Sequence, residues 1–140
     1  MSAQHGSAVA REGVGVLIVG ASGSGKSQLA LELMALGAEL VADDGVLLKN
    51  DAAGVSLCCP ASIKGVIEAR GVGLLSVNAI DQARLAIVVD MDKTVTQRLP
   101  APKSIAILGV EVPLVHGKNC VGLSAVVWCL LGGGQILPSD

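Results

Sequence analysis

Two groups of residues near the start of the chain are of types that act on phosphates. The first fits the pattern G-x-x-x-x-G-K-[ST] at each fixed position. Its glycines let backbone N–H groups curl around an anion, the lysine reaches the β- and γ-phosphates of a nucleotide, and the last hydroxyl can ligate Mg²⁺. We therefore predict a nucleotide phosphate-binding loop made of Gly20, Ala21, Ser22, Gly23, Ser24, Gly25, Lys26 and Ser27.

The second group is the adjacent pair Asp43 and Asp44. Beside bound phosphates and Mg²⁺, one carboxylate can bind the metal and the other can accept a proton from an attacking hydroxyl. The alternative is that one of the two only turns the chain toward Gly45. The pattern favours a chemical role for at least one of them.

The elements that must position these groups follow from the hydrophobic pattern. Residues 14–20 predict a buried strand, and residues 26–36 predict a helix with Leu29, Leu33 and Leu36 on its apolar side. Gly37 is a typical helix stop. Residues 38–42 predict a second strand that carries the aspartates at its end, so that a βαβ unit with a parallel strand pair and a right-handed crossover is expected. In such a sheet the site forms at the carboxyl ends of the strands.

The remainder of the chain predicts further short strands and one helix. Residues 46–58 indicate two strands around a turn, residues 85–92 a strand with an acid at its end, and residues 103–115 one or two strands. Residues 119–131 indicate a last helix, ended by three glycines. We expect a single α/β domain over residues 1–140.

Composition excludes several classes of protein. Of the 140 residues 51% are hydrophobic, the net charge is −2, and the only aromatic residue is Trp128. No basic field indicates nucleic acid, and no apolar run reaches the length of about 20 residues that a membrane-spanning helix needs. With no hydrophobic signal core at the start, the expectation is a cytoplasmic protein. The four cysteines match no zinc pattern and are expected to be buried free thiols: Cys58, Cys59, Cys120 and Cys129.

The loop alone does not define the reaction. The N-K-x-D segment of a GTPase is missing, and the LGGGQ segment at residues 131–135, which resembles an ABC-ATPase signature, stands too near the end of a short chain. A kinase for a small metabolite remains open, although arginine is scarce. A nucleotide-responsive interaction module without catalysis is a further alternative, disfavoured by the number of acids near the loop.

Several segments together resemble the HPr kinase/phosphorylase family. The resemblance is carried by HGSAVAREGVGVLIVGASGSGKS (residues 5–27), LALELMALGAELVADDGV (29–46), IEARGVGLLSV (67–77), TQRLP (96–100) and VPLVHGKN (112–119). It implies a P-loop kinase domain of the HPr kinase / phosphoenolpyruvate carboxykinase-like type, in a short form without an N-terminal domain. Without the resemblance, His5 would be a surface residue, and Glu68 with Arg70 a surface pair.

The resemblance also implies an activity and partners. The family phosphorylates a serine of the carrier protein HPr with ATP or pyrophosphate and Mg²⁺, and removes that phosphate by phosphorolysis. It is usually hexameric and regulates carbon and nitrogen metabolism linked to the phosphotransferase system.

The resemblance implies roles for individual residues. Lys26 would hold the phosphates, Asp44 would transfer the proton with Asp43 in support, and Ser27 would bind Mg²⁺. Glu68 would be a second residue on the metal side, His5 would lie beside the site, and Arg98 would stabilise the transferring phosphoryl group. Lys118 and Asn119 belong to the segment associated with phosphorolysis.

The chain departs from the family pattern at three places. Ala21 stands where the family usually has Asp, and Lys118 stands where an Arg is expected. Because Lys cannot make the bidentate phosphate contact of Arg, the phosphorylase activity is less secure than the kinase activity. The chain ends at Asp140, so that a C-terminal helix used by longer relatives to hold HPr is expected to be missing or reduced.

Overall fold

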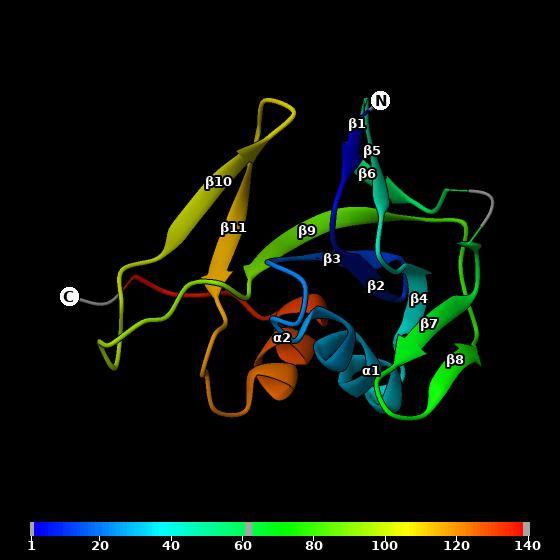
Figure 1. Cartoon of the computed structure of the whole chain (residues 1–140). Helices are drawn as coiled ribbons and strands as arrows, with labels where there is room; N and C mark the ends of the chain where they lie inside the picture. The colour runs from blue at the N-terminus through cyan, green and yellow to red at the C-terminus, as the bar shows by residue number, and fades with distance from the viewer. Residues whose placement is uncertain (1, 61–62, 139–140) are drawn as a thin grey trace.

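One large curved sheet carries two helices on one of its faces (Figure 1). The computed structural model describes residues 2–60 and 63–138, so the predicted domain limits of 1 and 140 and residues 61–62 lie outside the described residues. Within the described residues the sheet has nine strands. Seven of them run side by side in the order β1 (Ser2–Gln4), β5 (Val46–Asp51), β6 (Gly54–Cys58), β9 (Gln82–Asp90), β3 (Val14–Val19), β2 (Ser7–Arg11) and β4 (Glu39–Ala42).

The remaining strands form two hairpins. β11 (Val110–His116) pairs in parallel with the second half of β9, and β10 (Lys103–Ile107) pairs with β11. β7 (Val66–Ala69) and β8 (Gly73–Ser76) form a separate antiparallel pair. The strands predicted within residues 14–20, 46–58, 85–92 and 103–115 are confirmed.

The prediction that the strands before and after the first helix pair directly with each other is wrong. β3 and β4 run in the same direction, but β2 lies between them and is antiparallel to both. The cause is the turn at Glu12 and Gly13, where φ is 50° and 81°. Two successive positive φ angles are typical of the tight turn that folds one strand back along the next. The chain therefore inserts β2 into the place that a simple βαβ unit would give to β4.

Both predicted helices are present. α1 spans Lys26–Leu36 and buries Leu29 and Leu33, whereas Leu36, predicted to face the core, is 47% exposed. Gly37 ends α1 with φ at 123°, a conformation that L-residues rarely adopt. α2 spans Leu123–Leu131, so it begins four residues later than predicted, and Gly132 caps its end. No helix among the described residues is long and apolar enough to cross a membrane.

The sheet separates two hydrophobic clusters. One lies between the sheet and the helices and includes Val16, Ile18, Leu33 and Val127. The other is on the opposite face and is built from strand and loop residues, Leu17, Val41, Leu57 and Val88 among them. Residues 16–18 of β3 thus alternate between the two clusters, as side chains along a strand must. This two-sided burial fixes β3, and with it the start of the phosphate loop.

Arg11 of β2 connects the sheet to helix α2 by contacting Trp128, the only aromatic residue of the chain. Its guanidinium lies 4.2 Å from the centroid of the Trp128 ring, and its Nη1 donates to the Trp128 carbonyl at 2.9 Å. Among the described residues all four cysteines are free thiols, as predicted, but the prediction that they are buried is wrong: Cys58 and Cys59 are half-buried, and Cys120 and Cys129 are exposed. Burial raises the pKa of the Cys59 thiol.

Gly6 holds the start of β2 against β3 because it has no side chain. A Cβ at this position would lie 2.5 Å from the Ile18 carbonyl oxygen, which is backbone and cannot move freely. We expect Gly6→Ala to lower the free energy of unfolding, measured by urea denaturation, by about 1–3 kcal/mol. Gly45→Ala is the matched control, because no atom lies within 4 Å of its would-be Cβ. Equal stability of the two variants would contradict this account.

Candidate active site

The strand directions bring separate parts of the chain to one edge of the sheet. β3, β4, β9 and β11 share a direction, so their carboxyl ends meet at this edge, and the antiparallel β2 begins there. Val19 at the end of β3 pairs with Asp90 at the end of β9, while Ala42 at the end of β4 pairs with Ala8 of β2. The loop between β3 and α1 therefore has the end of β9 on one side and the β2–β4 pair on the other.

The loop is held by contacts at its first residues. The Lys26 ammonium donates to the carbonyl oxygens of Gly20 at 2.8 Å and Ala21 at 2.9 Å. The Ala21 N–H donates to both carboxylate oxygens of Asp92, each at 3.0 Å. Gly20 has φ of 148°, which L-residues rarely adopt, and a Cβ on it would lie 2.6 Å from the Ser24 hydroxyl oxygen, so this tight first turn favours glycine.

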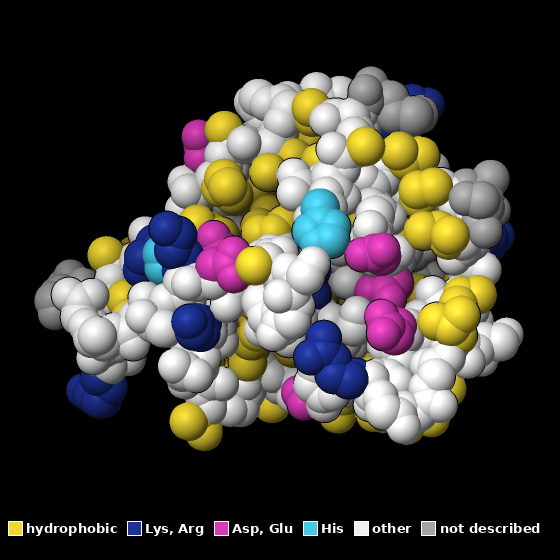
Figure 2. Space-filling view, in the orientation of Figure 1, with side chains coloured by type: hydrophobic (Ala, Val, Ile, Leu, Met, Phe, Trp, Pro, Cys, Tyr) yellow, Lys and Arg dark blue, Asp and Glu magenta, His cyan; other side chains and the backbone are white. Residues whose placement is uncertain are grey.

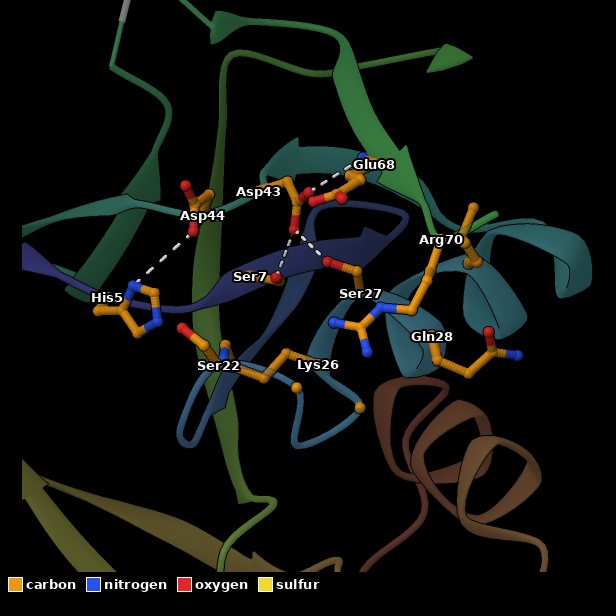
Figure 3. Close-up of a pocket in the computed structure, with 13 residues that line it drawn as sticks. His5, Ser7, Ser22, Lys26, Ser27, Gln28, Asp43, Asp44, Glu68 and Arg70 are labelled. Carbon is orange, nitrogen blue, oxygen red and sulfur yellow. Dashed lines mark hydrogen bonds and ion pairs between the residues drawn. The ribbon is translucent and has the colours of Figure 1, made fainter. Parts of the chain in front are cut away.

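A cavity of about 280 Å³ opens beside the loop. Figure 3 shows side chains from β2, α1, the end of β4 and the β7–β8 hairpin pointing into it. Five of the eight predicted loop residues line the cavity, whereas Gly20, Ala21 and Ser24 do not. The lining residues are His5, Ser7, Ser22, Gly23, Gly25, Lys26, Ser27, Gln28, Leu31, Asp43, Asp44, Glu68 and Arg70.

The two aspartates have different surroundings. Asp43 is 7% exposed, and its Oδ1 accepts hydrogen bonds from the hydroxyls of Ser7 at 2.6 Å and Ser27 at 2.9 Å. Its Oδ2 accepts from the Glu68 N–H at 3.3 Å. Both oxygens are thus engaged, and one of them is bonded to the serine that ends the phosphate loop (Figure 3).

Asp44 is open to solvent, with a side chain that is 85% exposed. Its Oδ1 lies 3.9 Å from Nδ1 of His5, and its backbone has φ of 64°. Asp is one of the few residues other than glycine that accept this left-handed conformation. The reversal of the chain at Asp44 turns the second carboxylate away from the buried network of the first. In Figure 2, acidic side chains gather beside a histidine at the middle of this face.

The β7–β8 hairpin brings two charged residues to the cavity. Glu68 lines it, as the resemblance implied, and so does Arg70, two residues further along the chain. Nη2 of Arg70 lies 3.9 Å from the point where a Cβ on Gly23 would stand. Among the described residues no ion pair joins Glu68 to Arg70, so the interpretation as a surface ion pair does not hold. The spacing of two along an extended segment, which places both on one side, could have indicated Arg70.

Besides the loop residues Gly20, Ala21 and Ser24, three further predicted site residues lie outside the cavity. Arg98 is exposed in the loop between β9 and β10. Lys118 and Asn119 are exposed in the loop between β11 and α2, where the Lys118 N–H donates to the Lys93 carbonyl at 3.0 Å. Both loops follow strands whose carboxyl ends reach the same edge of the sheet, on the β9 side of the phosphate loop. The structure thus brings His5, Lys26, Ser27, Asp43, Asp44 and Glu68 together and leaves these three apart.

Sequence reasoning missed Ser7 and Asp92 at this site. Ser7 is 1% exposed and bonds Asp43, and Asp92 bonds the first loop amide. No local motif marks Ser7, because it meets Asp43 only through the pairing of β2 with β4. For Asp92 there was a signal: it is the last residue of the predicted strand 85–92, which carries an acid at its end, although the observed β9 ends two residues earlier at Asp90.

The donor atoms of the site suit Mg²⁺. In sites for phosphoryl transfer this ion keeps several waters and takes one or two protein carboxylates together with oxygens of the phosphates. The hydroxyl of Ser27, with the Asp43 and Glu68 carboxylates nearby, supplies the hard oxygen atoms that such an ion prefers.

A glycine-rich loop between a buried strand and a helix, with an acid from another strand bonded to the loop serine, defines a phosphate-loop domain. The family model described as HPr Serine kinase C-terminal domain matches residues 1–127. The chain therefore belongs to the HPr serine kinase C-terminal domain family.

Curated relatives and a solved structure agree with this assignment. An HPr kinase/phosphorylase of Chloroherpeton thalassium is 37% identical over 145 residues, covering 88% of this chain and 42% of the relative. That of Chlorobium limicola is 41% identical over 144 residues, covering 88% and 43%. The Hpr(Ser) kinase/phosphatase from Coxiella burnetii superposes with a TM-score of 0.78 at 25% identity, covering 95% of this chain and 90% of that one. The chain thus spans less than half the length of these curated relatives.

Proposed function

We propose that this domain catalyses ATP- and Mg²⁺-dependent phosphorylation of a serine on an HPr-type carrier protein. The observation that carries the proposal is the division of the aspartate pair next to the phosphate loop. Asp43 is bonded to Ser27, and Asp44 is exposed at the mouth of the same cavity. One acid on the metal side and one free acid on the solvent side is the arrangement that phosphoryl transfer to a hydroxyl requires. The names of the relatives support HPr as the acceptor.

Each residue then has one task. The loop amides and Lys26 bind the β- and γ-phosphates, with Arg70 facing the loop from the other side of the cavity. Ser27, Asp43 and Glu68 hold Mg²⁺, which offsets phosphate charge when bound. Asp44 accepts the proton of the incoming serine hydroxyl, and His5, 3.9 Å away, orients that carboxylate. In the reverse direction Asp44 returns the proton to the leaving serine oxygen.

The test is incubation of the protein with ATP, Mg²⁺ and purified HPr, followed by mass spectrometry of HPr. We expect a mass increase of one phosphoryl group on a serine, abolished by EDTA. A small-metabolite kinase, the alternative reading of the motif, would bind Mg²⁺–ATP and leave HPr unmodified. Absence of phospho-HPr with a nucleotide-binding protein would therefore overturn the choice of substrate. Pyrophosphate as donor, the hexamer and the cytoplasmic location stay predictions.

The phosphorolysis direction is proposed to depend on the loop that contains Lys118. Since Arg makes a bidentate contact with phosphate that Lys cannot make, we expect Lys118→Arg to raise the rate of phosphorolysis relative to the rate of phosphorylation. The measurement compares pyrophosphate release from phospho-HPr and inorganic phosphate with phosphorylation of HPr. An unchanged ratio of the two rates would assign Lys118 a structural role only.

A further inference from the structure

The Ser7 hydroxyl is a buried polar group in the cavity that neither the loop motif nor the aspartate pair explains. It lies at the start of β2, where Ser7 pairs with Ile18 of β3, and the residue is 1% exposed. Its Oγ donates to Oδ1 of Asp43 at 2.6 Å. A hydroxyl that donates to an ionised carboxylate makes a short and strong hydrogen bond. The bond joins two strands that are 36 residues apart in the sequence.

The same carboxylate oxygen serves the phosphate loop. Oδ1 of Asp43 accepts from Ser7 and, at 2.9 Å, from the hydroxyl of Ser27. When the Ser27 hydroxyl hydrogen points to Asp43, the lone pairs of its oxygen are left for a cation. The orientation of Ser27 therefore depends on a fixed position of Asp43. The other oxygen of Asp43 has only the longer contact of 3.3 Å with the Glu68 N–H.

We propose that Ser7 is a positioning residue for Mg²⁺ at this site and acts through Asp43. This inference rests on the proposed function, in which Ser27 binds the ion. Ser7 fixes the position of Asp43 from the β2 side, and Asp43 orients the Ser27 hydroxyl, whose oxygen would then be available to hold the metal. Removal of such a supporting hydrogen bond typically weakens metal binding by about 10- to 100-fold.

The chain offers a matched control for the loss of a buried serine. Ser56 is 9% exposed, and its Oγ donates to Oδ2 of Asp51 at 2.6 Å, on the β5–β6 hairpin away from the cavity. This hydrogen bond is the main cause of the lowered pKa of Asp51. Ser7→Ala and Ser56→Ala each remove one hydroxyl from one carboxylate at the same distance, but only the first is connected to the loop serine.

The test measures binding by calorimetry, without turnover. A non-hydrolysable ATP analogue is titrated into wild type, Ser7→Ala and Ser56→Ala that have been freed of metal with EDTA and dialysed to remove the EDTA, and Mg²⁺ is then titrated into each complex. We expect Ser7→Ala to weaken Mg²⁺ binding by about 10- to 100-fold, with affinity for the metal-free nucleotide within twofold of wild type. Ser56→Ala is expected to match wild type in both titrations. Equal Mg²⁺ affinity of the two serine variants overturns the proposal.

A double-mutant cycle tests the route through Asp43. In an Asp43→Asn background, Ser7→Ala is expected to have less than a twofold further effect on Mg²⁺ affinity, because the carboxylate on which it acts is already lost. A further loss as large as in the wild-type background would contradict this route. If the wild-type protein binds neither nucleotide nor Mg²⁺, the proposed function itself fails, and the role of Ser7 fails with it. Failure of the proposed function would appear as a lack of binding by the wild type, whereas failure of the Ser7 proposal alone would appear as equal Mg²⁺ affinity of the two serine variants.

Discussion

The Asp44→Asn variant is expected to transfer phosphate to HPr about 10²–10⁴-fold more slowly than the wild type. A serine hydroxyl is a poor nucleophile until a base accepts its proton, and an amide cannot do so. Affinity for Mg²⁺–ATP is expected to change little, because Asp44 is exposed and makes none of the hydrogen bonds to the loop serine. The fold is expected to survive, because Asn tolerates the left-handed backbone at this position as Asp does. Initial rates of HPr phosphorylation and a nucleotide titration measure the two effects.

Two further variants define what the Asp44 result means. Glu12→Gln is a matched control, because Glu12 is also an exposed acid with positive φ, at the turn between β2 and β3 on the opposite edge of the sheet. It is expected to have the activity of the wild type. Asp43→Asn is expected to show a weakened dependence on Mg²⁺, since it removes the negative charge of the carboxylate that accepts from Ser7 and Ser27. If both aspartate variants phosphorylate HPr within a few-fold of wild type, the pair only shapes the turn and the mechanism is wrong.

Lys26→Ala is expected to lower phosphoryl transfer by about 10²–10³-fold, the usual effect of removing one donor from developing negative charge. In the structure the Lys26 ammonium bonds the carbonyls of Gly20 and Ala21, and these contacts place it at the start of the loop. Lys26 is only 8% exposed, so its replacement could also disturb the fold, and the fold of the variant has to be checked. Circular dichroism and urea denaturation supply that check, and the initial rate of HPr phosphorylation supplies the result.

The control for Lys26 is a lysine that lies outside the cavity. Lys49→Ala removes an exposed lysine of β5, and we expect wild-type activity from it. It shows how much of any effect comes from net charge alone. Turnover by a folded Lys26→Ala protein at a rate close to that of wild type would mean that the loop does not bind the transferred phosphate.

The parts of the site that depend on local chemistry could be predicted from the order of the residues. The glycine and lysine pattern of residues 20–27 predicted the loop, and the periodicity of Leu29 and Leu33 predicted α1 with Gly37 at its end. The predicted helix and its end were confirmed, although Leu36 is exposed, because the spacing of apolar residues and backbone freedom at glycine act over one or two helical turns. Phosphate binding by the loop stays a prediction. The acids Asp43 and Asp44 were found for the same reason, as neighbours at the end of one strand.

The difference between the two acids arises from contacts between distant segments of the chain. Adjacent carboxylates have the same local sequence, and only the approach of β2 and β7 buries Asp43 between Ser7 and the Glu68 N–H. Likewise, the insertion of β2 between β3 and β4 depends on long-range pairing that no periodicity reveals. Hydrogen bonds from residues far apart in the sequence therefore hold the Asp43 carboxylate next to the loop serine, whereas the Asp44 carboxylate faces solvent.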